Sequence, residues 1–172
     1  MSNELWDDNE FPLAFLITFR TYGTWLHGDE RESVDRHGYN IFGAPRRPQN
    51  SELNRRMKSN SINDAFLLSQ KCRSVVTDAG KSVCDYRGYL LYAANVRSNH
   101  AHTVVHARER PERLLNAFKA NATRELRAAG LVSQEHRIWS RGGSTRYLWK
   151  RSDLDSAVDY VLYCQGDDFL TF

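Results

Sequence analysis

The residues best suited to chemistry are two histidines, His100 and His102, which stand one residue apart in a run rich in β-forming residues. Alternate residues of a β-strand project to the same face of a sheet, so the two imidazoles should point the same way. Ala101, Thr103 and Val105 should then point to the opposite face. Two imidazoles at this spacing can bind one divalent cation. The alternative is a half-polar strand whose histidines make ordinary hydrogen bonds.

A second set of candidate residues lies in the last amphipathic segment, residues 153–165. Its apolar stripe, at three- and four-residue steps, consists of Leu154, Ala157, Val158, Val161 and Leu162. Gln165 follows Leu154 by three full helical turns, so it should point inward with the stripe. Tyr160 falls roughly 130° from the stripe centre, on its flank, and Tyr163 should point outward.

Basic residues are grouped in a way that suits a polyanion such as nucleic acid. One group is Arg46, Arg47, Arg55, Arg56 and Lys58, and the other is Arg137, Arg141, Arg146, Lys150 and Arg151. The net charge of +3 is a weak signal by itself, and a solvated surface is the alternative. Near the start of the chain, Arg20 stands beside Tyr22 and Trp25, aromatic residues that could stack on bases or close the end of a core.

Length and composition limit the kinds of protein that this sequence can encode. The 172 residues predict one domain, spanning residues 1–172, with 41% hydrophobic and 26% charged residues as in ordinary globular proteins. No apolar run approaches the ~18 residues of a membrane span, and the acidic N-terminal stretch is not that of a signal peptide. The three cysteines form no CxxC motif and cannot all pair, which favours a reduced, cytoplasmic chain.

The hydrophobic pattern predicts the elements that position these residues. The first half contains a strand at 13–19, a long basic loop at about 30–63 with one helical turn near 51–58, and a helix at 69–87 stopped by Gly88. Strands at 89–95 and 100–107 follow, and then a helix at 111–129 that starts at Pro111. The last part contains a loop with a Gly142–Gly143 hinge, a strand at 145–149 and a helix at 153–165 capped by Ser152. This order predicts an α+β fold, a ferredoxin-like split βαβ sandwich with an antiparallel sheet. The final helix should cover the open face of the sheet, where the histidines lie.

Four stretches of the chain together resemble a known family. They are residues 18–26, 99–102, 139–149 and 159–166, which include the His-x-His pair and the tyrosine helix. In this order they resemble the HUH single-tyrosine transposases, the insertion-sequence-200-like enzymes, and especially the REP-associated tyrosine transposases.

The resemblance implies a metal-dependent enzyme that cuts and rejoins single-stranded or hairpin DNA. Tyr160 would be the nucleophile and would form a 5′-phosphotyrosine, while His100, His102 and Gln165 would bind Mg²⁺ or Mn²⁺. A tyrosine hydroxyl is ordinarily a poor nucleophile at neutral pH, and a metal that polarises the phosphate compensates for this. Members of this family use the tyrosine helix within one subunit or in a partner, so a homodimer is one expected state.

The sequence departs from the family at the third metal ligand. That ligand, Gln or Asn, usually lies four residues after the tyrosine, a position occupied here by Cys164, whereas Gln165 lies at five. A thiol suits Mg²⁺ poorly, and a local irregularity of the helix could bring Gln165 into line with Tyr160. Tyr163 is the rival nucleophile.

We also expect DNA phosphates to be contacted by Arg20, Lys119, Arg124, Arg141 and Arg146. Two other functions fit the same pattern. A ferredoxin-like sheet can serve as a non-catalytic module that binds single-stranded nucleic acid, derived in this case from a transposase. A metal-dependent phosphodiesterase that uses water would not need Tyr160.

Overall fold

The structure, a computed structural model, describes residues 11–24, 50–59 and 64–164. The elements are β1 (Ala14–Arg20), α1 (Ser51–Ser59), α2 (Gln70–Arg87), β2 (Leu90–Val96), β3 (His100–His106), α3 (Pro111–Ala128), β4 (Ser144–Leu148) and α4 (Arg151–Tyr163). The helical turn expected near 51–58 is α1, and the rest of the predicted basic loop, at 30–49 and 60–63, lies outside the described residues. Within those residues, no helix is long and apolar enough to cross a membrane.

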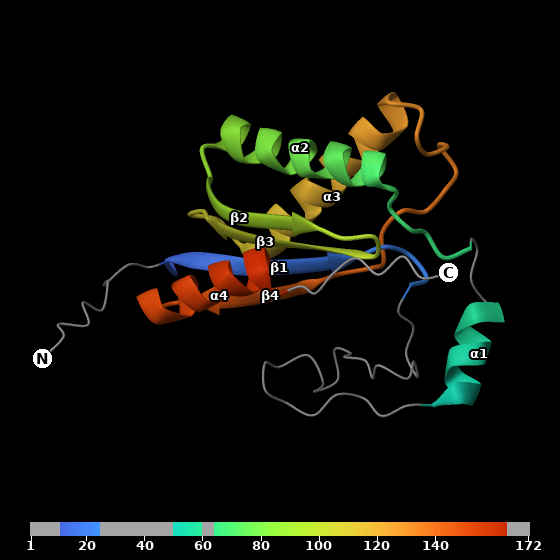
Figure 1. Cartoon of the computed structure of the whole chain (residues 1–172), viewed down its shortest axis with the longest axis horizontal. Helices are drawn as coiled ribbons and strands as arrows, with labels where there is room; N and C mark the ends of the chain where they lie inside the picture. The colour runs from blue at the N-terminus through green and yellow to red at the C-terminus, as the bar shows by residue number, and fades with distance from the viewer. Residues whose placement is uncertain (1–10, 25–49, 60–63, 165–172) are drawn as a thin grey trace, which may run out of the picture.

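The four strands form one antiparallel sheet in the order β2-β3-β1-β4. Two strand–helix–strand units are interleaved in this order, which is the split βαβ arrangement predicted from the sequence. The two strands in the centre are β3 and β1, with Thr18 paired to His102 and Arg20 to His100. The predicted α+β fold with an antiparallel sheet is confirmed (Figure 1).

The sheet carries helices on both faces. Helices α2 and α3 pack on one face, over a core that includes Phe15, Phe19 and Val105 (Figure 1). Helix α4 lies on the other face, where it buries a smaller cluster with Val104 and Leu148. Because side chains alternate along a strand, the even-numbered residues of β3 face α4 and the odd-numbered ones face the helix pair. This alternation decides which residues can form a site under α4.

Helix boundaries follow local chemistry at three of the four predicted ends. Ser69 caps α2 by accepting a hydrogen bond from the Cys72 backbone N–H, and Gly88 ends that helix with a left-handed φ of 67°. Pro111 opens α3, as predicted. The predicted N-cap Ser152 is wrong, because α4 begins earlier, at Arg151. The Arg151–Asp155 ion pair, 3.1 Å long, joins residues one turn apart and supports the earlier start.

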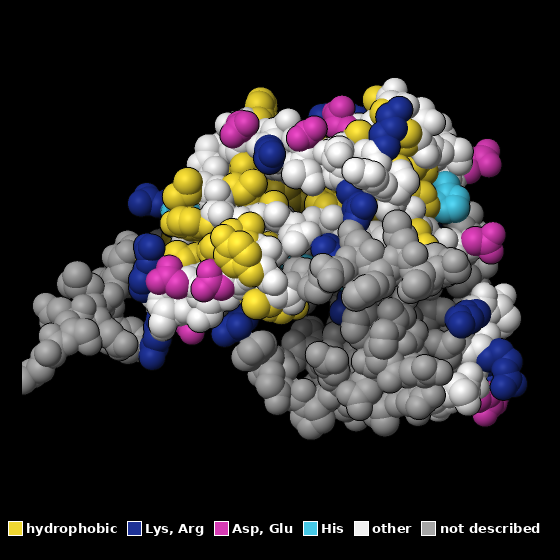
Figure 2. All heavy atoms as spheres, in the orientation of Figure 1, with side chains coloured by type: hydrophobic (Ala, Val, Ile, Leu, Met, Phe, Trp, Pro, Cys, Tyr) yellow, Lys and Arg dark blue, Asp and Glu magenta, His cyan; other side chains and the backbone are white. Residues whose placement is uncertain are grey.

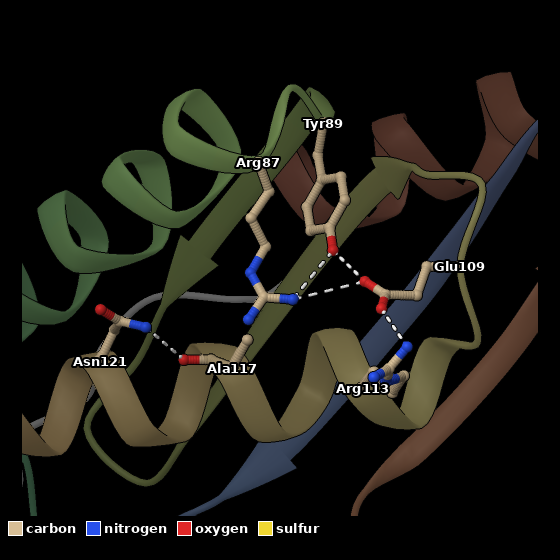
Figure 3. A network of polar contacts seen from close by, with 6 residues as sticks. All are labelled: Arg87, Tyr89, Glu109, Arg113, Ala117 and Asn121. Atoms are coloured by element: carbon tan, nitrogen blue, oxygen red, sulfur yellow. Dashed lines mark hydrogen bonds and ion pairs between the residues drawn. The ribbon is translucent and has the colours of Figure 1, made fainter.

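A polar network fixes the end of α2 against the start of α3. Tyr89 and Arg87 both donate hydrogen bonds to Glu109, which also pairs with Arg113 at 2.9 Å (Figure 3). Burial and then the bond to Glu109 raise the pKa of Tyr89. The Tyr89 hydroxyl, as a donor, is the first cause of the lowered pKa of Glu109. The network therefore has an ordinary structural role, on the helical layer.

The three cysteines are free thiols. Cys72 and Cys84 lie in the core, as the helical spacing predicts, and Cys164 is exposed. Burial, with a smaller effect of Asp85, raises the pKa of the Cys84 thiol to about 11. Such a thiol is inert at neutral pH.

The Gly142–Gly143 pair, predicted to be a hinge, lies in a part of the loop that packs closely on the sheet. Gly142 adopts a φ of 70°, and Gly143 lies so close to β1 that a Cβ there would stand 2.7 Å from the Thr18 carbonyl oxygen. The same Cβ would stand 2.9 Å from a methyl group of Leu115. Gly142 therefore adopts a left-handed backbone conformation, and Gly143 allows close packing of the loop against β1 and α3.

We predict that Gly143→Ala lowers the free energy of unfolding by about 1–3 kcal/mol, because the added methyl group overpacks a contact with the backbone. The matched control is Gly80→Ala in the interior of α2, where a Cβ meets nothing within 4 Å. That control should raise stability by about 0.5–1 kcal/mol. Urea denaturation measures both changes, and equal effects of the two substitutions would contradict the packing argument.

Candidate functional site

The two histidines of β3 lie side by side on the face covered by α4. Their ring centroids are 4.7 Å apart, with an angle of 75° between the ring planes. His102 is buried, whereas His100 is half-buried at the start of the strand. The expectation that both imidazoles project to one face is confirmed. That they bind a metal stays a prediction.

Both imidazole rings are oriented through Nδ1. His102 Nδ1 is hydrogen-bonded to Thr18 Oγ1 at 2.7 Å, from the residue paired with it across the sheet. His100 Nδ1 lies 2.6 Å from Asn99 Oδ1, which is an acceptor, so the ring nitrogen donates. Metal-binding histidines typically use one ring nitrogen for the ion and hold the other by a hydrogen bond of this kind. The arrangement therefore fits ligation through Nε2 of each ring.

The described residues supply two of the three expected metal ligands. Gln165, the predicted third, lies outside the described residues. Cys164 follows the end of α4 and is exposed, and the part of the chain that the structure describes has no group of three or more His, Cys, Asp or Glu side chains able to hold a metal. A pair of imidazoles suits a transition metal ion better than Mg²⁺, which prefers oxygen ligands.

Tyr160 lies on α4 directly beside His102. The ring centroids of Tyr160 and His102 are 5.5 Å apart and the rings meet edge to face at 74°. Tyr160 is 43% exposed, so its ring reaches the histidines while part of it stays accessible. Tyr163 is 77% exposed, as expected for a residue pointing outward. Between these two tyrosines, only Tyr160 has a described ring contact with the histidines.

The buried strip of α4 is narrower than the sequence predicted. Leu154, Ala157 and Val161 are buried against the sheet, but Leu162, predicted to belong to the stripe, is 43% exposed. Figure 2 shows hydrophobic side chains gathered on the surface over α4. The last turn is also held by a polar contact, in which Asn95 Nδ2 of β2 donates to the Val161 carbonyl oxygen at 2.9 Å. This bond fixes the helix one residue beyond Tyr160.

Two of the five predicted DNA contacts share the histidine face. Arg20 pairs with His100 in the register of β1 and β3, and Arg146 pairs with Leu16 in the register of β1 and β4. Strand alternation from Thr18 and Leu148 places both arginines on the side of α4. Arg141 is exposed in the loop before β4. These three stay candidates for phosphate contacts.

Lys119 and Arg124 belong to the helical layer on the other face of the sheet. Arg124 is exposed and pairs with Glu125 at 2.9 Å. Lys119 is half-buried, and its ammonium group donates hydrogen bonds to the carbonyl oxygens of Ser140, at 2.8 Å, and Gly142. Ser140 in turn donates its backbone N–H to the Arg20 carbonyl oxygen at 3.0 Å. Lys119 thus anchors the loop that carries Arg141.

For Lys119→Met we predict a loss of about 1–3 kcal/mol of stability, because two carbonyl oxygens lose a charged donor. The log–log salt slope of single-stranded DNA binding should stay unchanged. The matched control, Arg146→Gln, should lower that slope by about 0.7 if Arg146 contacts one phosphate. A fall of the same size for Lys119→Met would show that Lys119 contacts DNA, as the sequence alone suggested.

The anchoring role also has a pH signature. Burial, with a smaller effect of Arg137, lowers the pKa of Lys119 to about 8 from 10.5. Between these two values the unfolded chain holds the proton that the folded protein has lost, so stability gains with rising pH. We predict that the unfolding free energy of the wild type, relative to Lys119→Met, increases from pH 8 to 10.5. Denaturation series of both proteins measure this difference, and a decrease would contradict the shift.

Two residues of the site were missed by sequence reasoning. Thr18, which holds His102, was treated as part of an apolar strand and of the stretch that resembles the transposases, and Asn95, which holds α4, only as the end of another strand. The pairing of the strands in the sheet decides where both side chains lie. Each is a polar residue in an otherwise apolar strand, and this was the available signal.

Comparisons with known proteins give a similarity in structure and none in sequence. No protein-family profile matches the sequence, and no curated protein matches it with statistical significance. Among solved structures, the chain is similar to a REP-associated tyrosine transposase bound to a REP hairpin, with 12% sequence identity and a TM-score of 0.45. The match covers 86% of this chain and 63% of the other.

Proposed function

We propose that this protein cuts and rejoins single-stranded DNA in a metal-dependent reaction, with Tyr160 as the nucleophile. The observation that carries the proposal is the contact of the Tyr160 ring with His102, which itself lies against His100. A partly exposed phenol beside two oriented imidazoles combines a nucleophile with potential metal ligands. Helix α4 and strand β3 are far apart in sequence, so the fold brings these groups together.

In the proposed reaction, the Tyr160 oxygen attacks a backbone phosphorus atom and the bond from phosphorus to the 3′ oxygen breaks. The phenol proton passes to solvent, and the departing 3′ oxygen takes up a proton to become a hydroxyl group. The products are a 5′-phosphotyrosine and a free 3′-hydroxyl end. Attack of a 3′-hydroxyl on the phosphotyrosine reverses the step and rejoins DNA, because the covalent link preserves the energy of the broken bond.

His100 and His102 would hold the metal ion, with Gln165 or Cys164 as the candidate third ligand. When bound, the ion would polarise the phosphate and stabilise its developing charge. Thr18 and Asn99 hold the imidazole rings, and Asn95 holds the helix that carries Tyr160. Arg20 and Arg146, on the same face, supply positive charge for the neighbouring phosphates.

The direct test is incubation with a hairpin oligonucleotide carrying a single-stranded flank, with Mn²⁺ or with EDTA. The proposal predicts a protein–DNA adduct that survives denaturing electrophoresis, forms only with the metal and leaves a fragment with a 3′-hydroxyl end. Cleavage without an adduct would favour the water-using phosphodiesterase. Binding without cleavage would favour the second candidate function.

That second candidate is a non-catalytic module for single-stranded nucleic acid. It is favoured by the two arginines, Arg20 and Arg146, on the sheet face under α4, because phosphate contacts by arginine require no metal ion. It would keep Arg20 and Arg146 for phosphate contacts, and Tyr160 would have no covalent role. In that case, binding of single-stranded DNA should be equal in Mn²⁺ and in EDTA.

A further inference from the structure

Two exposed aromatic side chains stand next to each other along the β4 edge of the sheet. Tyr147 and Trp149 are 45% and 51% exposed, with ring centroids 6.2 Å apart and ring planes only 16° from parallel. Phe15 supports the pair from the core side, edge to face with Tyr147 at 5.1 Å. The rings are thus held in a common orientation with large areas open to solvent, which an aromatic residue with only a packing role would not need.

Strand β4 is an edge strand whose two faces serve different neighbours. It lies at the end of the strand order and pairs with β1. Tyr147 is opposite Phe15, on the side of the helix pair, whereas Arg146 points to the side of α4 and the histidines. A nucleic-acid strand that leaves the face with Arg146 can therefore reach the aromatic pair by crossing the single edge strand.

The charge around the aromatic pair matches a phosphate backbone. Residues 141–151 contain Arg141, Arg146, Lys150 and Arg151 and no acidic residue, with Arg146 on the α4 side of β4 and Arg151 paired with Asp155. Both residues that follow Trp149, Lys150 and Arg151, have exposed side chains. Parallel aromatic faces between cations are the arrangement by which proteins bind single strands, since the rings stack on bases and the cations contact phosphates. An apolar protein partner would not require this charge.

We propose that Tyr147 and Trp149 form a stacking platform for unpaired bases of a single DNA strand. The platform deepens the proposed function and rests on its substrate class, single-stranded DNA. It contributes to holding the strand and takes no part in bond cleavage, because it lies on the face of β4 opposite the histidines. Bases of any identity would bind, since every base offers a flat face.

The test compares binding of two fluorescent oligonucleotides, oligo(dT) and an abasic strand of equal length and charge. Trp149→Ala and Tyr147→Ala should each weaken binding of oligo(dT) by about 5- to 150-fold, the range for loss of one stacked base. Binding of the abasic strand should change less than twofold. Trp149→Tyr should restore most of the affinity, because a flat ring returns.

The matched control is Tyr86→Ala on α2, since Tyr86 is 91% exposed and belongs to the other layer. It should leave both affinities unchanged. Thermal melting of every variant separates loss of stacking from loss of folding. Of the two alanine substitutions, Trp149→Ala should disturb the fold less, because Tyr147 contacts the core residue Phe15. Equal loss for oligo(dT) and the abasic strand, or no loss in a folded variant, would overturn the platform.

Failure of the platform and failure of the proposed function give different results. If the platform variants bind oligo(dT) normally while the wild type still forms the Mn²⁺-dependent adduct, the platform is wrong and the function stands. If the wild type forms no adduct but its binding depends on bases and on Trp149, the platform stands and the function is the non-catalytic one. An aromatic pair that serves a protein partner would leave DNA affinity unchanged.

Discussion

Tyr160→Phe should abolish the covalent DNA adduct while leaving the affinity for single-stranded DNA within about twofold of the wild type. The substitution removes one hydroxyl group from a ring that is 43% exposed, so the edge-to-face contact with His102 and the packing of α4 persist. Loss of the attacking group should reduce the rate of cleavage on the order of 10⁴-fold or more. Denaturing electrophoresis with labelled DNA measures the adduct, and fluorescence anisotropy measures binding.

The matched control for this substitution is Tyr163→Phe, on the same helix three residues later. Tyr163 is 77% exposed and has no described contact with the histidines, so its variant should form the adduct at the wild-type rate. The opposite result, with adduct from Tyr160→Phe and none from Tyr163→Phe, would make Tyr163 the nucleophile. If neither substitution matters, the hydrolytic or binding-only function replaces the transposase-like one.

His100→Ala and the double substitution with His102→Ala should have the second large effect, on metal binding. Even outer hydrogen-bond partners of metal ligands are worth about 10- to 100-fold in affinity, so losing a ligand should weaken Mn²⁺ binding at least as much. Isothermal calorimetry with Mn²⁺ measures this, and adduct formation should fall in parallel. The single substitution at half-buried His100 is preferable for the fold, because His102 is buried and bonded to Thr18.

The matched control here is His106→Ala, at the far end of the same strand. His106 faces the same side, but its Nδ1 is hydrogen-bonded to the Leu13 carbonyl oxygen at 2.9 Å, six residues from His100. Its substitution should leave Mn²⁺ affinity unchanged. If the folded variant with both His100→Ala and His102→Ala bound Mn²⁺ as the wild type does, these histidines would not form a metal site.

The fold could be predicted from the sequence because hydrophobic periodicity reports how each element is buried. The alternation around His100 and the helical steps from Cys72 to Cys84 gave the correct elements, to within about two residues at most ends. The start of α4 was missed because the helix begins after Lys150 without a side-chain cap, so no capping hydroxyl group marks it in the sequence. The close packing at Gly143 was not predicted, because close approach of a loop to β1 depends on tertiary packing.

Only part of the candidate site could be predicted from the sequence. That His100 and His102 share a face follows from strand geometry alone, whereas the orientation of His102 by Thr18 follows from the register of two strands more than eighty residues apart. A helical wheel placed Tyr160 on a flank, but the packing of α4 on the sheet decides that this flank meets His102. The helical wheel also placed Lys119 on a polar face of its helix. In the structure its ammonium group donates hydrogen bonds to two loop carbonyl oxygens.

If Tyr160 is the nucleophile, it becomes covalently linked to DNA, and mass spectrometry can locate the linkage. The wild-type protein would be incubated with a hairpin oligonucleotide and Mn²⁺, the adduct digested with protease and nuclease, and the nucleotide-bearing peptide sequenced by mass spectrometry. We expect a single modified residue, Tyr160, carrying a 5′-linked nucleotide. Modification at Tyr163 or at another residue, or no modified peptide from protein that binds both the DNA and Mn²⁺, would contradict it.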